Sequence, residues 1–277
     1  MAVILVTGAT GNVGAPLVDH LRAAGVAVRS GCRNPRGAGS VRFDFRDAST
    51  WPAAFAGVEV MFLIRPPDLT AADLLPALTA GRATGLRHVV LLSVQGAGRV
   101  PILPHARLER WLRGSGLGWT IIRPSYFDQN LSTVFAADIR DRDVIAVPAG
   151  RGRTAFVDTH DVAAVSAVAL LDPAAHRQRV WTPTGPALTY DEVAAILSAE
   201  LHRQIRYLRP GIVAYVRHAR AQLHMPPPMI AITTVLHSTA RVGLAAFETD
   251  DVRTVTGRPP TTFARFAHRE RAVWLRQ

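Results

Sequence analysis

The chain contains no lysine. Its 277 residues include 32 basic side chains, and each of them is arginine. The absence of a side-chain primary amine excludes a Schiff-base enzyme, a phosphate-loop lysine and a catalytic Tyr-x-x-x-Lys pair. Arginine in place of every lysine is typical of a coding bias in the genome rather than of a functional choice.

Cysteine and long apolar runs are also scarce. The single Cys32 excludes an intramolecular disulfide and a thiolate metal cluster, which is typical of a reducing compartment. The longest uncharged stretch, 221–240, contains three consecutive prolines and therefore argues against a membrane span. The first residues include no basic leader and no cleavage site. We expect a soluble, cytoplasmic protein that does not interact with a membrane.

Charge and histidine patterns exclude further kinds of site. The formal net charge is +11, but the arginines are scattered, which favours a basic solvated surface over a nucleic-acid-binding face. None of the ten histidines has the spacing of a metal-binding motif such as His-Glu-x-x-His, so we predict no metal. With 48% hydrophobic and 19% charged residues, the composition is that of a globular protein.

Short apolar runs alternate with segments of helix length over the first 125 residues. Such alternation predicts an α/β fold, a doubly wound parallel Rossmann sheet with helices on both faces. The expected strands are 2–6, 26–30, 41–45, 58–64, 88–93 and 119–124, and the expected helices are 13–24, 70–84 and 105–114.

The pattern loosens after residue 125. A helix over 158–171 is expected to pack on the sheet. Thr189 and Glu192 have the spacing of a capping box and predict a helix within 187–202. The remaining residues favour a short strand and further helices, with a break at the three prolines.

Two parts of the chain are therefore expected to contribute differently. Residues 1–150 are predicted to form the Rossmann core that binds the coenzyme. Residues 151–277 are predicted to supply the remaining core elements and a small, mainly helical substrate lobe, all within a single structural unit.

The segment "VTGATGNVG" places three glycines directly after the first strand and at the start of a helix. Gly8 permits a tight turn, Gly11 lets the backbone approach a pyrophosphate, and Gly14 lets the helix pack close to the strand. The context predicts a dinucleotide site rather than a simple tight turn. The candidate residues of this loop are Thr7, Gly8, Thr10, Gly11, Asn12, Val13 and Gly14.

The second strand predicts which dinucleotide is bound. An NAD site needs an acidic residue near the end of that strand, yet no acid lies between Asp19 and Asp44. Arg33 stands just past the strand end, where a guanidinium can grip a 2′-phosphate in a bidentate manner. The sequence therefore favours NADP(H), with a solvated loop arginine as the alternative.

The chain resembles the NmrA-like NAD(P)-binding family of atypical short-chain dehydrogenase/reductases over most of its length. The glycine spacing carries the resemblance together with five other segments, which identify the family but not a substrate. These segments are "FLIRPP" (62–67), "GLRHVVLLSVQGAG" (85–98), "GWTIIRPSYFDQNL" (118–131), "AFVDTHDVAAV" (155–165) and "TGRPPTTFARFA" (256–267).

The resemblance implies further coenzyme contacts. Asp44 is expected to accept from the adenine amine with Phe45 beside it, although Asp44 has an alternative reading as a strand-ending acid. The end of the fourth strand and Arg65 are expected near the nicotinamide ribose. Outside the glycine loop the implied residues are Arg33, Asp44, Phe45, Leu63, Ile64, Arg65, Ser93 and Pro124.

The resemblance also locates the expected chemistry. Ser93 matches the catalytic Ser/Thr position of the superfamily, His105 the tyrosine position and Glu109 the lysine position. His105 shares a helical face with two leucines and would serve as a proton donor, since histidine titrates near neutrality. The alternative is a histidine bonded to the backbone at a helix N-terminus.

The loop after the sixth strand is implied to line the substrate pocket. Tyr126 is a candidate proton donor to a substrate oxygen, and Phe127 and Asn130 are candidate pocket residues. Core packing explains Phe127 equally well. Ser93, His105 and Tyr126 are thus the predicted catalytic residues.

Three functions fit these observations. The first is an NADPH-dependent reductase of a small hydrophobic or aromatic quinone, imine, enone or carbonyl compound, in secondary or xenobiotic metabolism. The second is an NADP(H)-sensing regulator without turnover, and the third is a non-redox cyclase or isomerase. We expect a monomer or a homodimer with a small-molecule substrate and no nucleic acid partner.

Overall fold

The computed structural model describes residues 3–101 and 103–276. The chain divides into two compact units, and each unit is assembled from three separate stretches. Unit 1 comprises Met1–Pro124, Thr159–Pro183 and Asp251–Arg258. Unit 2 comprises Ser125–Asp158, Thr184–Asp250 and Pro259–Gln277.

Unit 1 contains a seven-stranded sheet in which every neighbouring pair is parallel. Its order is β10-β6-β5-β4-β1-β2-β3, so the chain leaves β1 in one direction and then continues on the other side from β4. This reversal makes the sheet doubly wound and confirms the predicted Rossmann class. The strands are β1 Val3–Thr7, β2 Val28–Cys32, β3 Ser40–Arg42, β4 Val58–Ile64, β5 His88–Leu92, β6 Gly118–Ile122 and β10 Arg179–Trp181.

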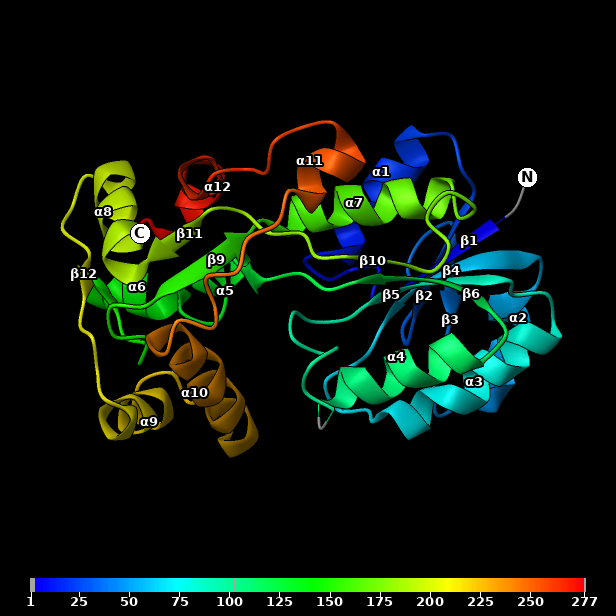
Figure 1. Cartoon of the computed structure of the whole chain (residues 1–277), viewed down its shortest axis with the longest axis horizontal. Coiled ribbons are helices and arrows are strands. Elements are labelled where there is room, and N and C mark those ends of the chain that lie inside the picture. The colour runs from blue at the N-terminus through cyan, green and yellow to red at the C-terminus, as the bar shows by residue number, and fades with distance from the viewer. Residues whose placement is uncertain (1–2, 102, 277) are drawn as a thin grey trace. The chain divides into compact units, whose positions relative to one another are not determined.

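Helices cover both faces of this sheet. Figure 1 shows α1, α7 and α11 on one face and α2, α3 and α4 on the other. The apolar helix α7 is buried on almost every side, because it packs against the sheet, α1 and α11. The helices are α1 Gly14–Ala23, α2 Trp51–Phe55, α3 Ala71–Ala83, α4 Pro104–Gly114, α7 Thr159–Leu171 and α11 Asp251–Thr256, with a 3-10 turn, η1, at Ala48–Thr50.

The sequence pattern explains how unit 1 forms its core. Strands β5 and β6 are buried at every position, as expected for central parallel strands that helices cover on both sides. Leu108 and Leu112 of α4 are fully buried in the core cluster that also contains Leu63 and Ile121. The leucine face of α4 therefore packs against the sheet.

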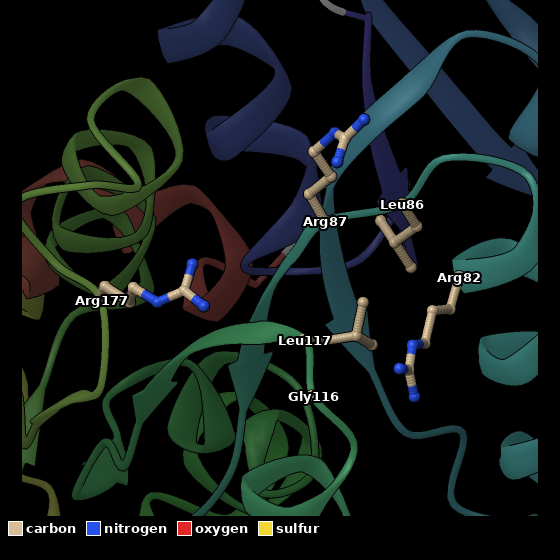
Figure 2. Close-up of a pocket in the computed structure, with 6 residues that line it drawn as sticks. All are labelled: Arg82, Leu86, Arg87, Gly116, Leu117 and Arg177. Atoms are coloured by element: carbon tan, nitrogen blue, oxygen red, sulfur yellow. The ribbon is translucent and has the colours of Figure 1, made fainter.

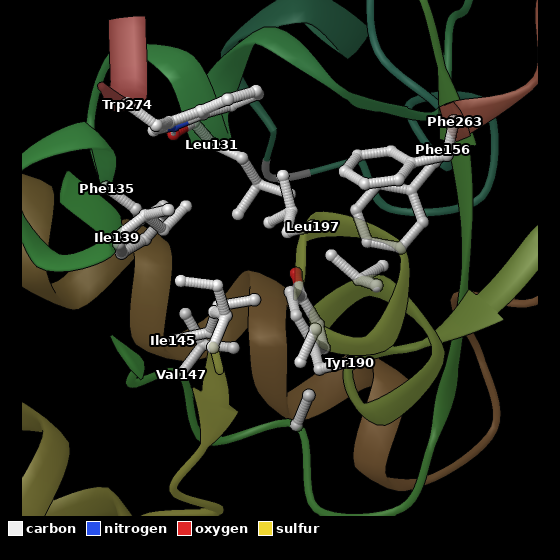
Figure 3. Close-up of a cluster of buried hydrophobic side chains, with 14 of the residues drawn as sticks. Leu131, Phe135, Ile139, Ile145, Val147, Phe156, Tyr190, Leu197, Phe263 and Trp274 are labelled. Carbon is white, nitrogen blue, oxygen red and sulfur yellow. Dashed lines mark hydrogen bonds between the residues drawn. The ribbon is translucent and has the colours of Figure 1, made fainter. Parts of the chain in front are cut away.

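Unit 2 has two small sheets and a set of helices. Strands β7 Tyr126–Phe127, β9 Arg153–Val157 and β11 Ala187–Thr189 form one sheet, and β8 Val144–Ile145 pairs with β12 Arg206–Tyr207. Its core is rich in aromatic rings, as Figure 3 shows. The helices are α5 Gln129–Ser132, α6 Ala136–Arg142, α8 Tyr190–Leu201, α9 Ile212–Ala221, α10 Pro227–Arg241 and α12 Phe263–Glu270, followed by a 3-10 turn, η2, at Arg271–Trp274.

Local signals in the sequence set the helix starts of unit 2. The predicted capping box at α8 is confirmed, since Thr189 Oγ1 accepts from the Glu192 amide at 3.2 Å and Glu192 Oε2 accepts from the Thr189 amide at 2.7 Å. The prolines after α9 interrupt the helical run as predicted. Pro227 and Pro228 then stand in the first turn of α10, where a missing N–H costs nothing.

Candidate coenzyme and catalytic site

The loop between β1 and α1 has a shape that favours glycine at one position and requires it at another. Gly8 has a φ of +62°, which places it in the left-handed region, and its carbonyl accepts from the Gly11 amide at 3.0 Å. A Cβ at Gly14 would lie 2.1 Å from the Gly8 oxygen. The loop therefore turns tightly and brings the start of α1 against the end of β1.

This loop fits a pyrophosphate. Gly8, Thr10, Gly11 and Asn12 are exposed, so their backbone is open to a ligand. Val13 precedes α1 and offers no side-chain cap. The Ala15 amide donates to the Gly11 carbonyl at 2.9 Å and Pro16 has no N–H, so an anion would be met by the exposed backbone of the loop and the positive end of the helix dipole. These residues would hold the coenzyme at the carboxyl end of the parallel strands, where such folds bind nucleotides.

Three of the predicted loop and strand-end residues make hydrogen bonds or packing contacts within unit 1. The Thr7 hydroxyl donates to the Phe62 carbonyl at 3.0 Å and accepts from the Ile64 amide at 2.9 Å, which fastens β1 to β4. The Leu63 side chain lies in the core of unit 1, so only its backbone faces the strand end. Ile64 lies against Gly8, at 3.0 Å from the position of a Cβ there.

On the adenine side of the predicted site, Arg33 is exposed and Asp44 accepts a hydrogen bond. Arg33 follows β2 directly and is exposed, and it makes no hydrogen bond or ion pair with the described part of the chain. Arg29, by contrast, donates to the carbonyls of Ala54 and Ala56. Asp44 accepts from the Arg46 amide at 2.9 Å. Phe45 is buried and packs edge-on against Phe43.

Ser93 lies at the end of β5 and belongs to a charged network. Its hydroxyl donates to Glu109 Oε1 at 2.6 Å. Glu109 is only 3% exposed, and Arg123 grips both of its oxygens, through Nε at 2.9 Å and Nη2 at 2.5 Å. Glu109, which matches the lysine position of the superfamily, is thus paired with a guanidinium from the end of β6.

The surroundings hold Arg123 in this pose. A Cβ at Gly98 would lie 2.5 Å from Arg123 Nη1, so the glycine leaves the space that the guanidinium fills. Arg113 adds a second, longer contact to Glu109 at 3.9 Å. The sequence matches Glu109 to the lysine position but predicts no role for it, and it does not predict that Arg123 is its partner. The available signal was an acid on the leucine face of α4, which needs a buried cation as partner.

His105 lies in the first turn of α4 and is half-buried. Burial and the nearby charge of Arg65 lower its pKa from 6.5 to about 4, and Glu109 opposes this only weakly. The ring is therefore neutral at pH 7. A neutral imidazole still donates one N–H to a ligand, but it is not an imidazolium acid.

Arg65 folds back on its own loop after β4. Its Nη1 donates to the carbonyls of Pro66 at 2.9 Å and Leu69 at 2.5 Å. Its Nε is buried and finds no hydrogen-bond partner in residues 3–101 and 103–276. The loop thus fixes one positive charge at the carboxyl end of β4, and burial lowers the pKa of Arg65.

The other predicted site residues belong to unit 2. Tyr126 and Phe127 form β7, and Asn130 lies in α5. All three side chains are half-buried. Burial raises the pKa of the Tyr126 phenol far above its usual value, and hydrogen bonding with Tyr190 and Asn130 offsets only part of that rise. Pro124, the last residue of the first stretch of unit 1, is buried and its carbonyl accepts from the Gln95 amide.

A hollow of about 330 Å³ lies at the opposite edge of the sheet, where β5 and β6 begin (Figure 2). The ends of α3 and α4 meet there, and Arg82 donates to the Ser115 carbonyl that ends α4. Arg82 stands in the last turn of α3 and complements the partial negative charge of the helix carbonyls, which explains its presence without a ligand. The lining residues are Arg82, Leu86, Arg87, Gly116, Leu117 and Arg177.

Within 3–101 and 103–276, no group of three or more His, Cys, Asp or Glu side chains is arranged to hold a metal ion. No helix in the same ranges is long and apolar enough to span a bilayer.

Comparison with known proteins identifies the family of the chain. The model of the NmrA-like family matches residues 1–223. The chain belongs to the NmrA-like family. This NmrA-like protein is 33% identical to the NAD(P)H azoreductase of Xenophilus azovorans, over 98% of the chain and 99% of the relative. It is 31% identical to the agroclavine dehydrogenase of Claviceps fusiformis, over 98% of each protein.

Solved structures agree on the fold. An NADPH-dependent quinone oxidoreductase from Escherichia coli, complexed with NADPH, superposes with a TM-score of 0.84 at 22% identity. The match covers 96% of this NmrA-like protein and 99% of the other chain. At this identity the likeness establishes the shared Rossmann architecture.

Proposed function

We propose that this NmrA-like protein is an NADPH-dependent reductase of a small hydrophobic or aromatic substrate, of the quinone, imine, enone or carbonyl class. The observation that carries the proposal is the glycine loop, whose left-handed turn favours glycine at position 8, whose close approach to α1 requires glycine at position 14, and whose exposed backbone can receive an anion. Relatives aligned over nearly their whole length include an NAD(P)H azoreductase and a dehydrogenase. Both names describe oxidoreductases, and the first of them names NAD(P)H as the coenzyme.

The choice of NADPH rests on Arg33. Its guanidinium is exposed directly after β2 and has no partner among the residues that the structure describes. No acid stands between Asp19 and Asp44 to accept from a ribose 2′-hydroxyl. A 2′-phosphate would supply the anion that Arg33 lacks.

The bound coenzyme would supply a hydride, and the residues of the protein must then stabilise the anion that forms on the substrate. Neutral His105 offers one N–H for this purpose, and Tyr126 offers a phenol O–H. The Ser93 proton is already donated to Glu109, so Ser93 orients rather than protonates. Quinones, enones and imines suit weak donors such as either of these, because their reduced anions are delocalised and need no strong acid.

A hydrophobic substrate suits the surface of unit 2. Most of the exposed large apolar side chains of the described chain lie between 208 and 247, a stretch that contains no Asp or Glu. A substrate with an apolar body would find apolar side chains exposed along this stretch. The side chains are Leu208, Ile212, Val213, Val216, Ile232, Val235, Leu236, Val242, Leu244 and Phe247.

One observation favours a second candidate, an NADP(H)-sensing regulator without turnover. Glu109 occupies the lysine position, and it binds the Ser93 hydroxyl that a dehydrogenase uses on its substrate. A protein that only senses the coenzyme would lose nothing by this change.

Turnover separates the two candidates. Purified protein would be mixed with NADPH and a panel of quinones, enones, imines and azo dyes, and oxidation followed at the nicotinamide absorbance. We expect turnover with at least one class and at least tenfold lower kcat in His105→Ala or Tyr126→Phe. Tight NADPH binding without turnover on any substrate would favour the regulator instead.

A further inference from the structure

Arg65 directly follows β4, and only one of its terminal nitrogens is engaged by the protein. Its Nη1 donates to the carbonyls of Pro66, Pro67 and Leu69, at 2.9, 3.3 and 2.5 Å. Its Nη2 makes no hydrogen bond within the described part of the chain and, unlike Nε, is not buried. The guanidinium is thus anchored through Nη1, and its Nη2 is open to a ligand.

The acid next to Arg65 does not neutralise its charge. Asp68 lies 4.0 Å from Arg46, and Arg46 also contacts Asp73 at 3.8 Å. Among the residues that the structure describes, no carboxylate lies within ion-pair distance of Arg65. A half-buried cation without a counterion costs free energy. An anionic ligand would offset that cost.

The loop that holds Arg65 is constrained. Pro66 and Pro67 each have a fixed φ, and the Leu69 amide donates to the Pro66 carbonyl at 3.1 Å. The Leu69 side chain is buried in the core of unit 1. The carbonyls that bind Nη1 are therefore in place before a ligand arrives. A cation held in this way stabilises a new anion without a cost for its own reorganisation.

The sheet topology indicates which part of a ligand Arg65 meets. The strand order reverses between β1 and β4, and open α/β sheets bind ligands in the crevice at such a reversal. Ile64 lies against Gly8 of the glycine loop, and Arg65 is the next residue. Arg65 therefore borders the same crevice as the glycine loop, on the side of β4.

Both anionic groups of NADPH have other partners in the proposed site. The pyrophosphate would lie on the glycine loop after β1, and the 2′-phosphate beside Arg33 after β2. The nicotinamide half would then lie on the opposite side of the crevice, over β4 and β5, and it carries no negative charge there. An anion that meets Arg65 therefore belongs to the substrate.

We infer that Arg65 is a further catalytic residue, which binds through Nη2 the negative charge that reduction creates on the substrate. The inference rests on the proposed function. When the substrate carbon accepts a hydride with its electron pair, the π electrons move to the oxygen or nitrogen, and this atom later takes a proton from water. Until then the anion would accept from Arg65. Burial and then the charge of Arg65 lower the pKa of His105, so the neutral imidazole that offers an N–H lies near the same cation.

The first test measures anion binding without a reaction. Benzoate is the probe, because its carboxylate resembles the substrate anion and NADPH does not reduce it, and benzamide is the neutral control. Nitrogen-15 NMR of labelled arginine in the coenzyme-free protein follows the buried Nε–H of Arg65, which is identified by its loss in Arg65→Met. We expect this signal to shift with benzoate and not with benzamide. A signal that benzoate leaves unmoved overturns the inference.

The second test measures turnover. Arg65→Met should lower kcat about tenfold or more, because the substrate anion loses its cation. Arg110→Met removes the same charge from an exposed position of α4 and should keep the parent kcat. If Arg65→Met and Arg110→Met have the same kcat, the inference is wrong.

The third test separates the substrate from the coenzyme as the source of the anion. Fluorescence titration should show that Arg65→Met binds NADPH as tightly as the parent protein, which also shows that the variant is folded. A tenfold weaker affinity would assign Arg65 to the coenzyme and overturn the inference. Absence of turnover in the parent protein would overturn the proposed function, whereas the benzoate titration would still decide whether Arg65 binds an anion.

Discussion

The expected site residues of the two units have different surroundings. In unit 1, Ser93 is held by a buried ion pair between Glu109 and Arg123, and the coenzyme loop consists of exposed backbone. In unit 2, Tyr126 is surrounded by neutral aromatic rings and one uncharged imidazole. A buried ion pair depends on both partners, because either one alone is an unpaired charge in a poor solvent. The stability of a neutral cluster depends instead on its rings staying uncharged.

The largest effect should follow from breaking the ion pair of unit 1. Glu109→Ala leaves Arg123, which is 19% exposed, without its carboxylate, and should cost about 4 kcal/mol of unfolding free energy. Urea denaturation would measure it. The matched double variant Glu109→Ala with Arg123→Ala should lose less than the sum of the two single variants. If the losses of unfolding free energy were strictly additive, the two side chains would not be coupled. The buried ion pair would then no longer distinguish unit 1 from the neutral cluster of unit 2.

A backbone clash in the coenzyme loop should come next. Gly14→Ala places a Cβ 2.1 Å from the Gly8 oxygen and should cost about 3 kcal/mol, with a loss of NADPH binding. Gly114→Ala is the control, since a Cβ at the end of α4 meets nothing within 4 Å. Thermal melting and the fluorescence of bound NADPH would report both effects. Equal behaviour of the two variants contradicts the requirement for glycine.

Acid should then destabilise both units through buried neutral rings. His88 in β5 and His237 have pKa values lowered to about 4 and about 3, chiefly by burial. In the unfolded chain each imidazole has a pKa near 6.5, so below this pH the unfolded state binds more protons than the folded state. The free energy of unfolding is therefore undiminished by these rings above pH 6.5 and decreases as the pH falls toward 4. Each ring should cost about 2 kcal/mol at pH 5. Urea midpoints between pH 4 and 8 would show a shallower slope in His237→Phe.

The smallest effect concerns the choice of coenzyme in unit 1. Arg33→Ala should weaken NADPH binding about tenfold, or about 1.4 kcal/mol, and leave NADH binding unchanged. Arg110→Ala, an exposed arginine of α4, is the control. Fluorescence titration with each nucleotide would measure the ratio. A parallel loss of both nucleotides would show that Arg33 acts on general charge rather than on a 2′-phosphate.

The sequence predicted those features that short spacing encodes. Six of the seven strands of the parallel sheet follow from apolar runs, and the α8 start follows from Thr189 and Glu192. The seventh strand, β10, escaped prediction because Arg179–Trp181 is too short to show a pattern. Its place beside β6 depends on pairing with a strand more than fifty residues earlier in the chain.

The sequence by itself determined the coenzyme loop, because the turn at Gly8 and the close approach at Gly14 are local needs of consecutive residues. Only the tertiary structure decided what surrounds the side chains. It joined Ser93, Glu109 and Arg123 from three segments, and it buried His237 among tyrosines from elsewhere in unit 2. Protonation and hydrogen-bond direction depend on neighbours distant in the chain, so a residue type alone cannot give them.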